Sequence, residues 1–498
     1  MYLVLGDSAT KLALFVLYAL IARVLGTRGF GDYTVAISLS FFVTSAALGI
    51  DVIVSREVAR DPKNIDGLFW DSIVLKLAAG LPILGLVTGF AAVSNDKPTI
   101  VISVALLGLS NLLDVVAQSP HAVLRGVEDM APTSLALVLE GIVEVGLAVV
   151  VLSVFSASLV ALGAVAVIAS LVAMAYIWVA LDRRGFRPHR RGTSRGKNWL
   201  LIAAIPTGIT SIFGYLLGRL DAVLLSLITH NPHKVGLYGA AYRLFEGTLF
   251  LSWAVALAVF PVLSRLPRRS SDLRRAFEVS TMVAAGISIP LGAAMALFGP
   301  VLVTDVFGQS YAGAGSTTRL LGVCTGIYGV YVLAAFTLAA QDRQHAFPIL
   351  AGAALLVNVV LNLTLIPALG LSGAAIAMDV AQGLLTVLML WLVTGIIGRY
   401  SLARILCSSI VGGAAMVIVA QILGSDTVGL VVALVCFYPA FLGTEWTLHR
   451  DDLADVVAAL RRGPGVADGA VDPVLPRAPA PGSQRRRGAA RLARWRRR

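Results

Sequence analysis

The stretch GFGDYTVA (residues 29–36) begins an apolar segment, and a related stretch, VGLYGAA (235–241), begins another far along the chain. Three pairs of residues align at one offset of 205: Gly31 with Gly236, Tyr33 with Tyr238 and Ala36 with Ala241. Weaker matches follow in the same order, VSR (54–56) with LSR (263–265) and RGVEDMAP (125–132) with QDRQHAFP (341–348). Matches that recur in one order indicate a duplicated structural unit.

The composition is that of an integral membrane protein. Hydrophobic residues make up 57% of the 498 residues and charged residues only 14%, with a mean hydropathy of +0.84. A helix needs about 20 apolar residues to cross the hydrocarbon layer. We therefore predict an all-α, polytopic membrane protein of about fourteen spans: 3–25, 31–53, 72–94, 99–119, 133–154, 158–181, 200–226, 237–262, 277–302, 314–340, 348–366, 372–397, 403–423 and 428–447.

The distribution of basic residues gives these spans an orientation. If the N-terminus is cytoplasmic, 31 of the 40 Lys and Arg residues fall on the cytoplasmic side, three on the opposite side and six within spans. Lys and Arg are enriched in cytoplasmic loops. The split predicts an even number of spans, two cytoplasmic termini and a location in the cell (inner or plasma) membrane. It also explains the net charge of +12 without nucleic acid, because basic residues there face anionic lipid.

The repeat divides the chain into parts. The copies are six spans apart, an even number, so both have the same orientation and their pseudo-twofold axis follows the membrane normal. We predict two parallel six-helix bundles, 1–181 and 200–397, joined by a basic cytoplasmic linker, 182–199. Two further helices lie in 398–448. The tail, 449–498, is basic and rich in Pro, Gly and Ala; it is either a disordered arm on anionic headgroups or a docking segment for a partner protein.

Charged residues inside spans are the main functional signal, because a charge in the bilayer centre normally faces a cavity or a partner. Arg243 and Glu246 are three residues apart and can pair on one helical face, as a binding group or as a structural salt bridge. Arg219 and Asp221 point apart, so each needs its own partner. We also expect Arg319 and Asp379 to pair across two spans.

A polar pair recurs in both copies of the repeat. Glu140 and Glu144 are one helical turn apart, and Asn358 and Asn362 have the same spacing in the second copy. Two adjacent carboxylates in a low dielectric cannot both be ionised freely, so at least one holds a proton or meets a cation. Either both pairs face the cavity between the bundles and serve ion coupling, or they form hydrogen bonds that lock each bundle.

The remaining intramembrane charges are Asp114, Lys76 and Arg23. Asp114 belongs with Asn111 and Gln118 to a polar stripe on one helical face, which is typical of a helix that lines a cavity. Lys76 and Arg23 either contribute positive charge to the cavity or extend toward the membrane surface. The three cysteines lie in apolar runs with no CxxC or Cys/His pattern, so we predict no metal site and no cofactor.

Two longer stretches resemble a known family. ALIARVLGTRGFGDYTVAISL (19–39) and NVVLNLTLIPALGLSGAAIA (358–377), with their Asn-x-x-x-Asn, Ile-Pro and Gly-x-x-Gly-Ala-Ala patterns, resemble the polysaccharide-transporter, or oligosaccharide-flippase, branch of the multidrug/oligosaccharidyl-lipid/polysaccharide (MOP) exporter superfamily. The resemblance covers spans 1–12 and extends loosely over all fourteen. It implies a flippase that moves an undecaprenyl-diphosphate-linked oligosaccharide to the outer leaflet for surface polysaccharide or lipopolysaccharide biosynthesis, alongside polysaccharide assembly proteins.

The predicted mechanism uses the intramembrane charges. Guanidinium or ammonium groups in the cavity replace the hydration of a lipid diphosphate, and our candidates are Arg219, Arg243, Arg319, Lys76 and Arg23. The candidates for ion coupling or a polar cavity lining are Glu140, Glu144, Asp114, Asp221, Glu246, Asn358, Asn362 and Asp379. Alternatives on the same fold are a lipid II flippase and a cation-coupled small-molecule antiporter. An enzyme is not expected, because the outward loops are too short for a catalytic domain. An ATP-driven pump is not expected either, because no Walker A motif occurs.

Overall fold

The computed structural model describes residues 2–47, 49–60, 65–94, 97–154, 158–186 and 196–448. Within these ranges the chain forms helices and no strands, as predicted: α1 (Tyr2–Ser40), η1 (Phe41–Ala47), α2 (Ile50–Arg60), α3 (Ile65–Ser94), α4 (Pro98–Gly126), α5 (Ala131–Val154), α6 (Leu159–Arg183), α7 (Gly196–Thr229), α8 (Pro232–Arg265), α9 (Ser271–Phe307), η3 (Gln309–Ala314), α10 (Gly315–Ala340), η4 (Gln344–Ala346), α11 (Phe347–Leu369), α12 (Leu371–Ile397), α13 (Leu402–Leu423) and α14 (Thr427–Leu448). The predicted tail and half of the predicted linker (187–195) lie outside the described residues.

Helix α1 is two helices joined at Gly26. Gly26 has φ 64° and ψ 178°, a left-handed conformation that favours glycine. The rings of Tyr18 and Tyr33 lie 6.3 Å apart, although 15 residues of straight helix would separate them by about 22 Å. The chain therefore reverses direction at Gly26, and the two predicted spans 3–25 and 31–53 are distinct.

Thirteen segments of the described chain are long and apolar enough to cross a membrane. The first, Ala13–Arg60, contains both spans that meet at Gly26, so the prediction of about fourteen spans is confirmed. The second of these spans is not one helix, as 31–53 had implied. It consists of the end of α1, the 3-10 helix η1 and α2, and it continues to Arg60. Many large apolar side chains are exposed on these helices, among them Leu86, Ile349 and Ile422, which is the surface that lipid covers.

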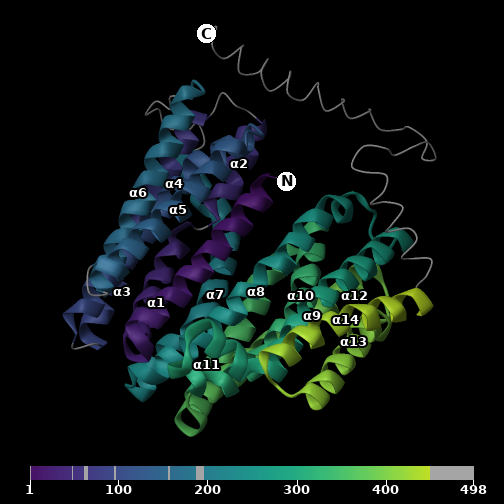
Figure 1. Cartoon of the computed structure of the whole chain (residues 1–498). Coiled ribbons are helices and arrows are strands. Elements are labelled where there is room, and N and C mark those ends of the chain that lie inside the picture. Colours follow the sequence, from purple (N-terminus) through teal and green to yellow (C-terminus); the bar gives the residue numbers. More distant parts are fainter. Residues whose placement is uncertain are drawn as a thin grey trace.

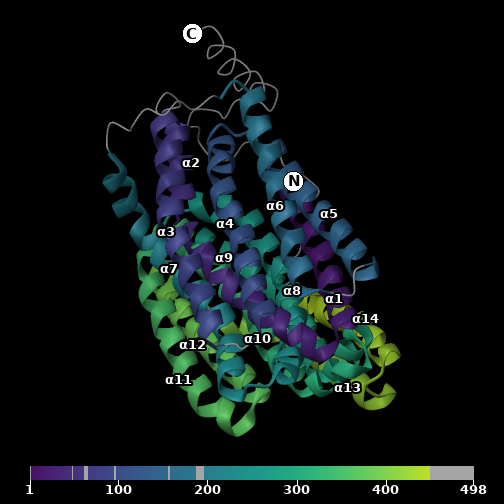
Figure 2. The same cartoon turned by 90° about the vertical axis from the view of Figure 1, so that its left-hand side faces the viewer.

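The helices form two lobes (Figures 1 and 2). Figure 1 shows α2–α6 on one side of the molecule and α8–α14 on the other, with α1 and α7 between them. Helix α4 packs on α6 as α10 packs on α12, and α5 packs on α6 as α11 packs on α12. Likewise α3 packs on α4 as α9 packs on α10, and α5 contacts α1 as α11 contacts α7. This repetition is what a duplicated six-span unit requires, and α13 and α14 pack outside it, on each other and on α9.

Helix α7 contacts both lobes. Leu200 and Ala204 in its first turns pack in a buried cluster with Ile50 and Phe69 of the first lobe. Further along, Leu217 packs in a cluster of the second lobe. The structure thus gives α7 a connecting role that the predicted domain limit at residue 200 did not include.

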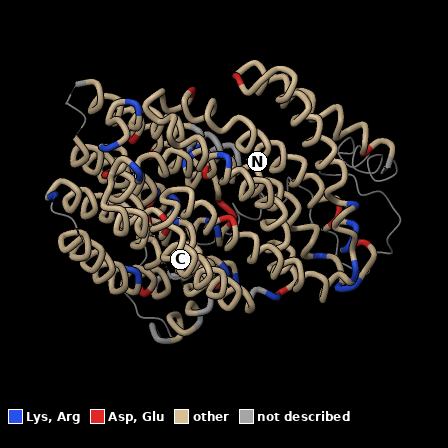
Figure 3. The backbone as a smooth tube through the Cα atoms, turned by 90° about the horizontal axis from the view of Figure 1, so that it is seen from below, with Lys and Arg blue, Asp and Glu red and all other residues tan. Residues whose placement is uncertain are grey.

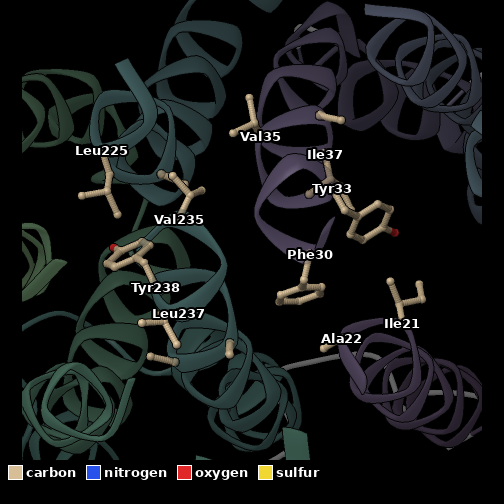
Figure 4. Packing of buried hydrophobic residues seen from close by; sticks show 14 of the residues in the cluster. Ile21, Ala22, Phe30, Tyr33, Val35, Ile37, Leu225, Val235, Leu237 and Tyr238 are labelled. Atoms are coloured by element: carbon tan, nitrogen blue, oxygen red, sulfur yellow. The ribbon is translucent and has the colours of Figure 1, made fainter. Parts of the chain in front are cut away.

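The lobes meet where the repeat is clearest in the sequence. A Cβ atom on Gly31 would lie 1.8 Å from the carbonyl oxygen of Pro232, and one on Gly236 would lie 1.9 Å from that of Thr27. Each contact is the counterpart of the other at the offset of 205, as expected for a self-complementary contact across a twofold axis. Figure 4 shows the surrounding cluster, with Phe30 and Tyr33 on one helix and Val235 and Tyr238 on its counterpart. Only glycine allows the two backbones to approach this closely.

Successive turns of the chain alternate between two ends of the molecule. One end, called here the basic end, holds the helix ends at Arg60, Gly126, Arg183, Arg265, Ala340 and Ile397. Contacts such as that of Ser55 Oγ with the Ala122 carbonyl (3.0 Å) lie there. The opposite end holds the turns at Gly26, Lys97, His230, Gly308, Gly370 and Gly424. There Lys97 pairs with Asp32 (2.7 Å) and His233 Nδ1 lies 2.7 Å from Thr27 Oγ1. Seen from below, several charged residues lie near the middle of the molecule rather than at its rim (Figure 3).

Candidate functional site between the two lobes

A glutamate bridges two arginines inside the molecule. Arg219 of α7 donates from Nη2 to Glu246 Oε1, and Arg243 of α8 donates from Nη1 to Glu246 Oε2. Arg243 and Glu246 share a face because they are three residues apart on α8. The predicted Arg243–Glu246 pair is confirmed. Arg219 joins it from the neighbouring helix, which its local sequence did not reveal.

Aromatic rings cover the flat faces of both guanidinium groups. The guanidinium carbon of Arg219 lies 4.2 Å from the centroid of Phe41 and 5.4 Å from that of Tyr242. The guanidinium carbon of Arg243 lies 3.7 Å from the centroid of Tyr18. A cation over a ring face is stabilised by the ring quadrupole. Since Tyr18 and Phe41 precede α2 and the arginines follow residue 200, the cluster connects the two halves of the chain.

Phe41, Tyr242 and Tyr18 were not predicted from the sequence to belong to the site. One signal was available for Phe41, because at the offset of 205 that relates Gly31 to Gly236 it is the counterpart of Glu246. The guanidinium group of Arg219 therefore contacts Glu246 with its polar edge and Phe41, the counterpart of Glu246, with its flat face. No comparable signal identified Tyr18.

The arginines are enclosed while the glutamate is accessible. The side chains of Arg219 and Arg243 are 9% and 7% exposed, against 32% for Glu246. The adjoining cavity measures about 10 Å³, close to the space that one water requires. It is lined by Thr34, Ser38, Gly218, Arg219, Ala222, Tyr238, Gly239, Tyr242 and Arg243. The two arginines are thus paired with the protein's own carboxylate.

The carboxyl groups of the first lobe form a second cluster next to the arginines. Glu140 lies in hydrogen-bonding contact with Asp114 and with Ser170, and Glu144 interacts electrostatically with Arg243. A hydrogen bond between two carboxyl groups needs one proton. Asp114 therefore has neighbours within the first lobe, and its place in a cavity lining stays a prediction. Asn111 likewise has a neighbour there, donating to Ser40 Oγ at 3.1 Å.

The asparagine pair lies elsewhere than the glutamate pair. Asn362 Nδ2 donates to Asp221 Oδ1 (2.7 Å) and to the Asn358 carbonyl (2.9 Å), while Tyr238 donates to Asp221 Oδ2 (3.1 Å). Both asparagines are fully buried. The expectation that both polar pairs face a cavity is therefore wrong for the second copy, where hydrogen bonds join α7, α8 and α11. Asp221 and Arg219 do have separate partners, as predicted.

Lys76, Arg23 and Arg319, three of the predicted cavity cations, lie away from the central cluster, and the first two have partners of their own. Lys76 is fully buried and bonds to Asp51 and to Ser119 Oγ (2.9 Å), so it neither reaches the cavity nor extends to the surface. Arg23 lies at the opposite end, donating from Nε to the Val306 carbonyl (2.9 Å). Its position matches the alternative of an arginine at the membrane surface.

The predicted pair of Arg319 and Asp379 does not form. Asp379 Oδ1 accepts a hydrogen bond from the backbone N–H of Cys324 at 3.1 Å. Arg319 is exposed at the start of α10, beyond the reach of that carboxylate. The sequence could not decide this pairing, because it depends on the register between α10 and α12.

Solved structures share this fold. The lipid II flippase MurJ in an inward closed conformation superposes with a TM-score of 0.70 at 12% identity, covering 90% of this chain and 98% of that one. A multidrug-resistance MATE family transporter of the MOP superfamily, inward-facing, superposes with a TM-score of 0.62 at 16% identity, covering 77% of this chain and 93% of that one. The chain therefore has the fold of these multi-pass membrane proteins.

Sequence comparison identifies the family. Residues 1–267, more than half of the chain, match the family described as Polysaccharide biosynthesis protein, and the chain belongs to this family. Residues 206–364 also match the MatE family. A curated relative, the probable low-salt glycan biosynthesis flippase Agl15 of Haloferax volcanii, is 25% identical over 182 residues, which is 36% of this chain and 38% of that protein. The relatives are flippases and transporters by name, in agreement with the expectation of a non-enzymatic protein.

Proposed function

We propose that the protein is a flippase that moves an undecaprenyl-diphosphate-linked oligosaccharide from the cytoplasmic to the outer leaflet for surface polysaccharide biosynthesis. The observation that carries the proposal is the buried pair of arginines, Arg219 and Arg243, between the two lobes. A membrane interior does not solvate a diphosphate, and guanidinium forks are the protein groups best suited to replace its hydration. The family membership and the printed name of Agl15 support a glycan as cargo.

The proposed transport cycle is alternating access. The lobes touch through Gly31 and Gly236 near the opposite end, and the arginines lie further along α7 and α8, with Arg243 over the ring of Tyr18 of α1. We propose that the basic end is cytoplasmic, since Lys and Arg concentrate there. The substrate then enters from the basic end. Rocking of the lobes about the arginine cluster exposes the bound substrate to the opposite side of the membrane. The polyprenyl chain stays in lipid throughout.

A lipid II flippase is the second candidate. The solved MurJ structure matches over 98% of its length, a match that supports the alternative, although likeness at 12% identity concerns the fold alone. The two candidates differ in the glycan and agree on the lipid diphosphate. A cation-coupled antiporter is less well supported, because the central cluster holds two cations and one carboxylate.

The test of the proposed function is a cell from which the protein has been removed. We expect loss of surface glycan and accumulation of its lipid-diphosphate-linked precursor on the cytoplasmic side, measured by mass spectrometry of extracted lipids. Accumulation of lipid II instead would favour the second candidate. Normal glycan export without any precursor accumulation would refute both flippase proposals.

A further inference from the structure

The central cluster has an anion of its own, and this bears on how a substrate enters. Each oxygen of Glu246 accepts from one arginine, through Nη2 of Arg219 and Nη1 of Arg243. The rings of Phe41 and Tyr18 lie over guanidinium faces, so an anion can approach only along a guanidinium edge. Glu246 occupies the N–H edge of each guanidinium group through which the two arginines can bind one shared anion. A diphosphate that used both arginines would need the space in which its carboxylate lies.

Charge and hydrogen bonding favour exchange of one anion for another. Arg219 and Arg243 share the Glu246 carboxylate, and the Glu144 carboxyl group lies close enough to Arg243 to interact with it electrostatically. A diphosphate diester carries a negative charge on each phosphoryl group and offers more acceptor oxygens than a carboxylate. Each guanidinium can then present two parallel N–H groups to a phosphoryl group. Because an unpaired buried charge is costly, the arginines should at no stage lose one anion before they gain the other.

Exposure decides which member of the cluster can move. The side chain of Glu246 is 32% exposed, whereas those of the arginines are 9% and 7% exposed and are held between helices and rings. The adjoining cavity of about 10 Å³, which both arginines line, is too small for a diphosphate. Of the three charged side chains Glu246 is the most exposed, so it is the one that can leave its partners most readily.

We propose that Glu246 is an internal competitor of the substrate, whose carboxylate holds Arg219 and Arg243 in the empty protein and is displaced by the diphosphate. This inference rests on the proposed flippase function. It makes Glu246 a specificity-determining residue, because an anion with a single weak charge gains nothing over the resident carboxylate. It also gives a means of release, since Glu246 competes for the arginines once the site opens to the other side.

The first experiment measures binding of inorganic pyrophosphate to the purified full-length protein by isothermal titration calorimetry. We expect Glu246→Gln, which keeps the shape and removes the charge, to bind pyrophosphate at least about tenfold more tightly than the wild type. Glu278→Gln on α9 is the matched control and should bind as the wild type does. Equal or weaker binding by Glu246→Gln, or no binding by either protein, overturns the inference.

A second experiment uses the wild-type protein, so it does not depend on a variant that folds. Carbodiimide with glycine ethyl ester labels free carboxyl groups, and peptide mass spectrometry measures labelling at Glu246. We expect pyrophosphate to raise this labelling several-fold, since displacement frees the carboxylate from both arginines. Unchanged or reduced labelling would contradict displacement. Both readouts are separate from glycan export in cells, so failure of the inference and failure of the flippase proposal can be told apart.

Discussion

Arg219 and Arg243 combine three properties in one place: burial, a carboxylate at the polar edge and an aromatic ring at the face. A lysine in either position would keep the charge but lose the planar fork and the stacking. The identity of these residues as arginines, and not only their charge, should therefore matter for a diphosphate cargo. Glu246 then sets what the arginines bind when no cargo is present.

We expect Arg243→Lys to lower transport at least about tenfold, because a bidentate contact becomes a single point charge. Arg219→Glu and Arg243→Glu should abolish export, since two like charges would then face Glu246. Export of surface glycan in cells is the measurement, with membrane abundance checked by immunoblot. Arg319→Lys is the control, because Arg319 is exposed at the start of α10, and this variant should export normally. Full export by the charge reversals would exclude the arginines as the cargo site.

Glu140 and Glu144 retain their predicted role as a test of proton or cation coupling. Glu140 contacts Asp114, and Glu144 interacts with Arg243, so a proton gained or lost there changes the field at the anion site. We expect Glu140→Gln with Glu144→Gln to lower transport and to flatten its dependence on pH in proteoliposomes. The control is Glu128→Gln, at an exposed turn. A variant that transports normally at every pH would make the pair structural.

The Lys76–Asp51 pair gives a prediction about stability. Removal of one partner of a buried ion pair costs about 3–5 kcal/mol, whereas an exposed pair contributes about 0–1 kcal/mol. Lys76→Met should therefore lower the thermal midpoint strongly, and Lys76→Met with Asp51→Leu should recover much of the loss. Lys97→Met is the control, because the side chain of Lys97 is 53% exposed. Unfolding followed by tryptophan fluorescence in detergent checks this, and equal effects at both lysines would contradict the assignment.

At the scale of elements, three glycines, Gly26, Gly31 and Gly236, shape the interface between the lobes. Gly26 ends the first span with a positive φ and lets the chain reverse direction. Gly31 and Gly236 then bring α1 and α8 into backbone contact, each opposite the carbonyl of the other helix. Further along the chain, the counterpart positions Phe41 of η1 and Glu246 of α8 are separated by the side chain of Arg219. Beside them Gly247 of α8 packs against Phe15 of α1, so the two helices stay in contact at the arginine cluster.

We expect Gly31→Ala or Gly236→Ala to prevent the lobes from closing at the opposite end, because the added Cβ would meet a carbonyl oxygen at 1.8 or 1.9 Å. Overpacking of this kind costs about 1–3 kcal/mol or more. Gly214→Ala in α7 is the matched control, since nothing lies within 4 Å of its Cβ. Thiol-reagent labelling of a cysteine placed at Ser38 reports access to the interface. Labelling equal to that of the control would contradict the role of the glycines.

At the scale of the whole molecule, the lobes meet at the opposite end, where Gly31 and Gly236 lie. Contacts at the opposite end join the lobes: Arg23 to the Val306 carbonyl (2.9 Å), Tyr311 to the Ala22 carbonyl (2.9 Å) and Thr27 to His233 (2.7 Å). All of these must break before a cargo can leave by that end.

A crosslink across this end should therefore stop transport. We expect Thr27→Cys with His233→Cys, in a background without the three native cysteines, to block export when oxidised and to recover on reduction. Asp305→Cys with Thr427→Cys joins two side chains within the second lobe, 2.8 Å apart, and should leave export unchanged. Export assayed with and without oxidant provides the measurement. Undiminished export by the crosslinked variant would show that the lobes need not separate at this end during transport.

The sequence alone determined the number of spans, the alternation of the turns and the repeat. These follow from hydropathy, charge and glycine positions, which are local properties that the bilayer constrains directly. Tertiary structure decided which charges meet. Arg219 reaches Glu246 from another helix, and Lys76 pairs with Asp51 inside one lobe, although each was equally plausible in a cavity. The reason is physical: a buried charge takes the partner that helix packing brings near it, and the register between helices is not written in either segment alone.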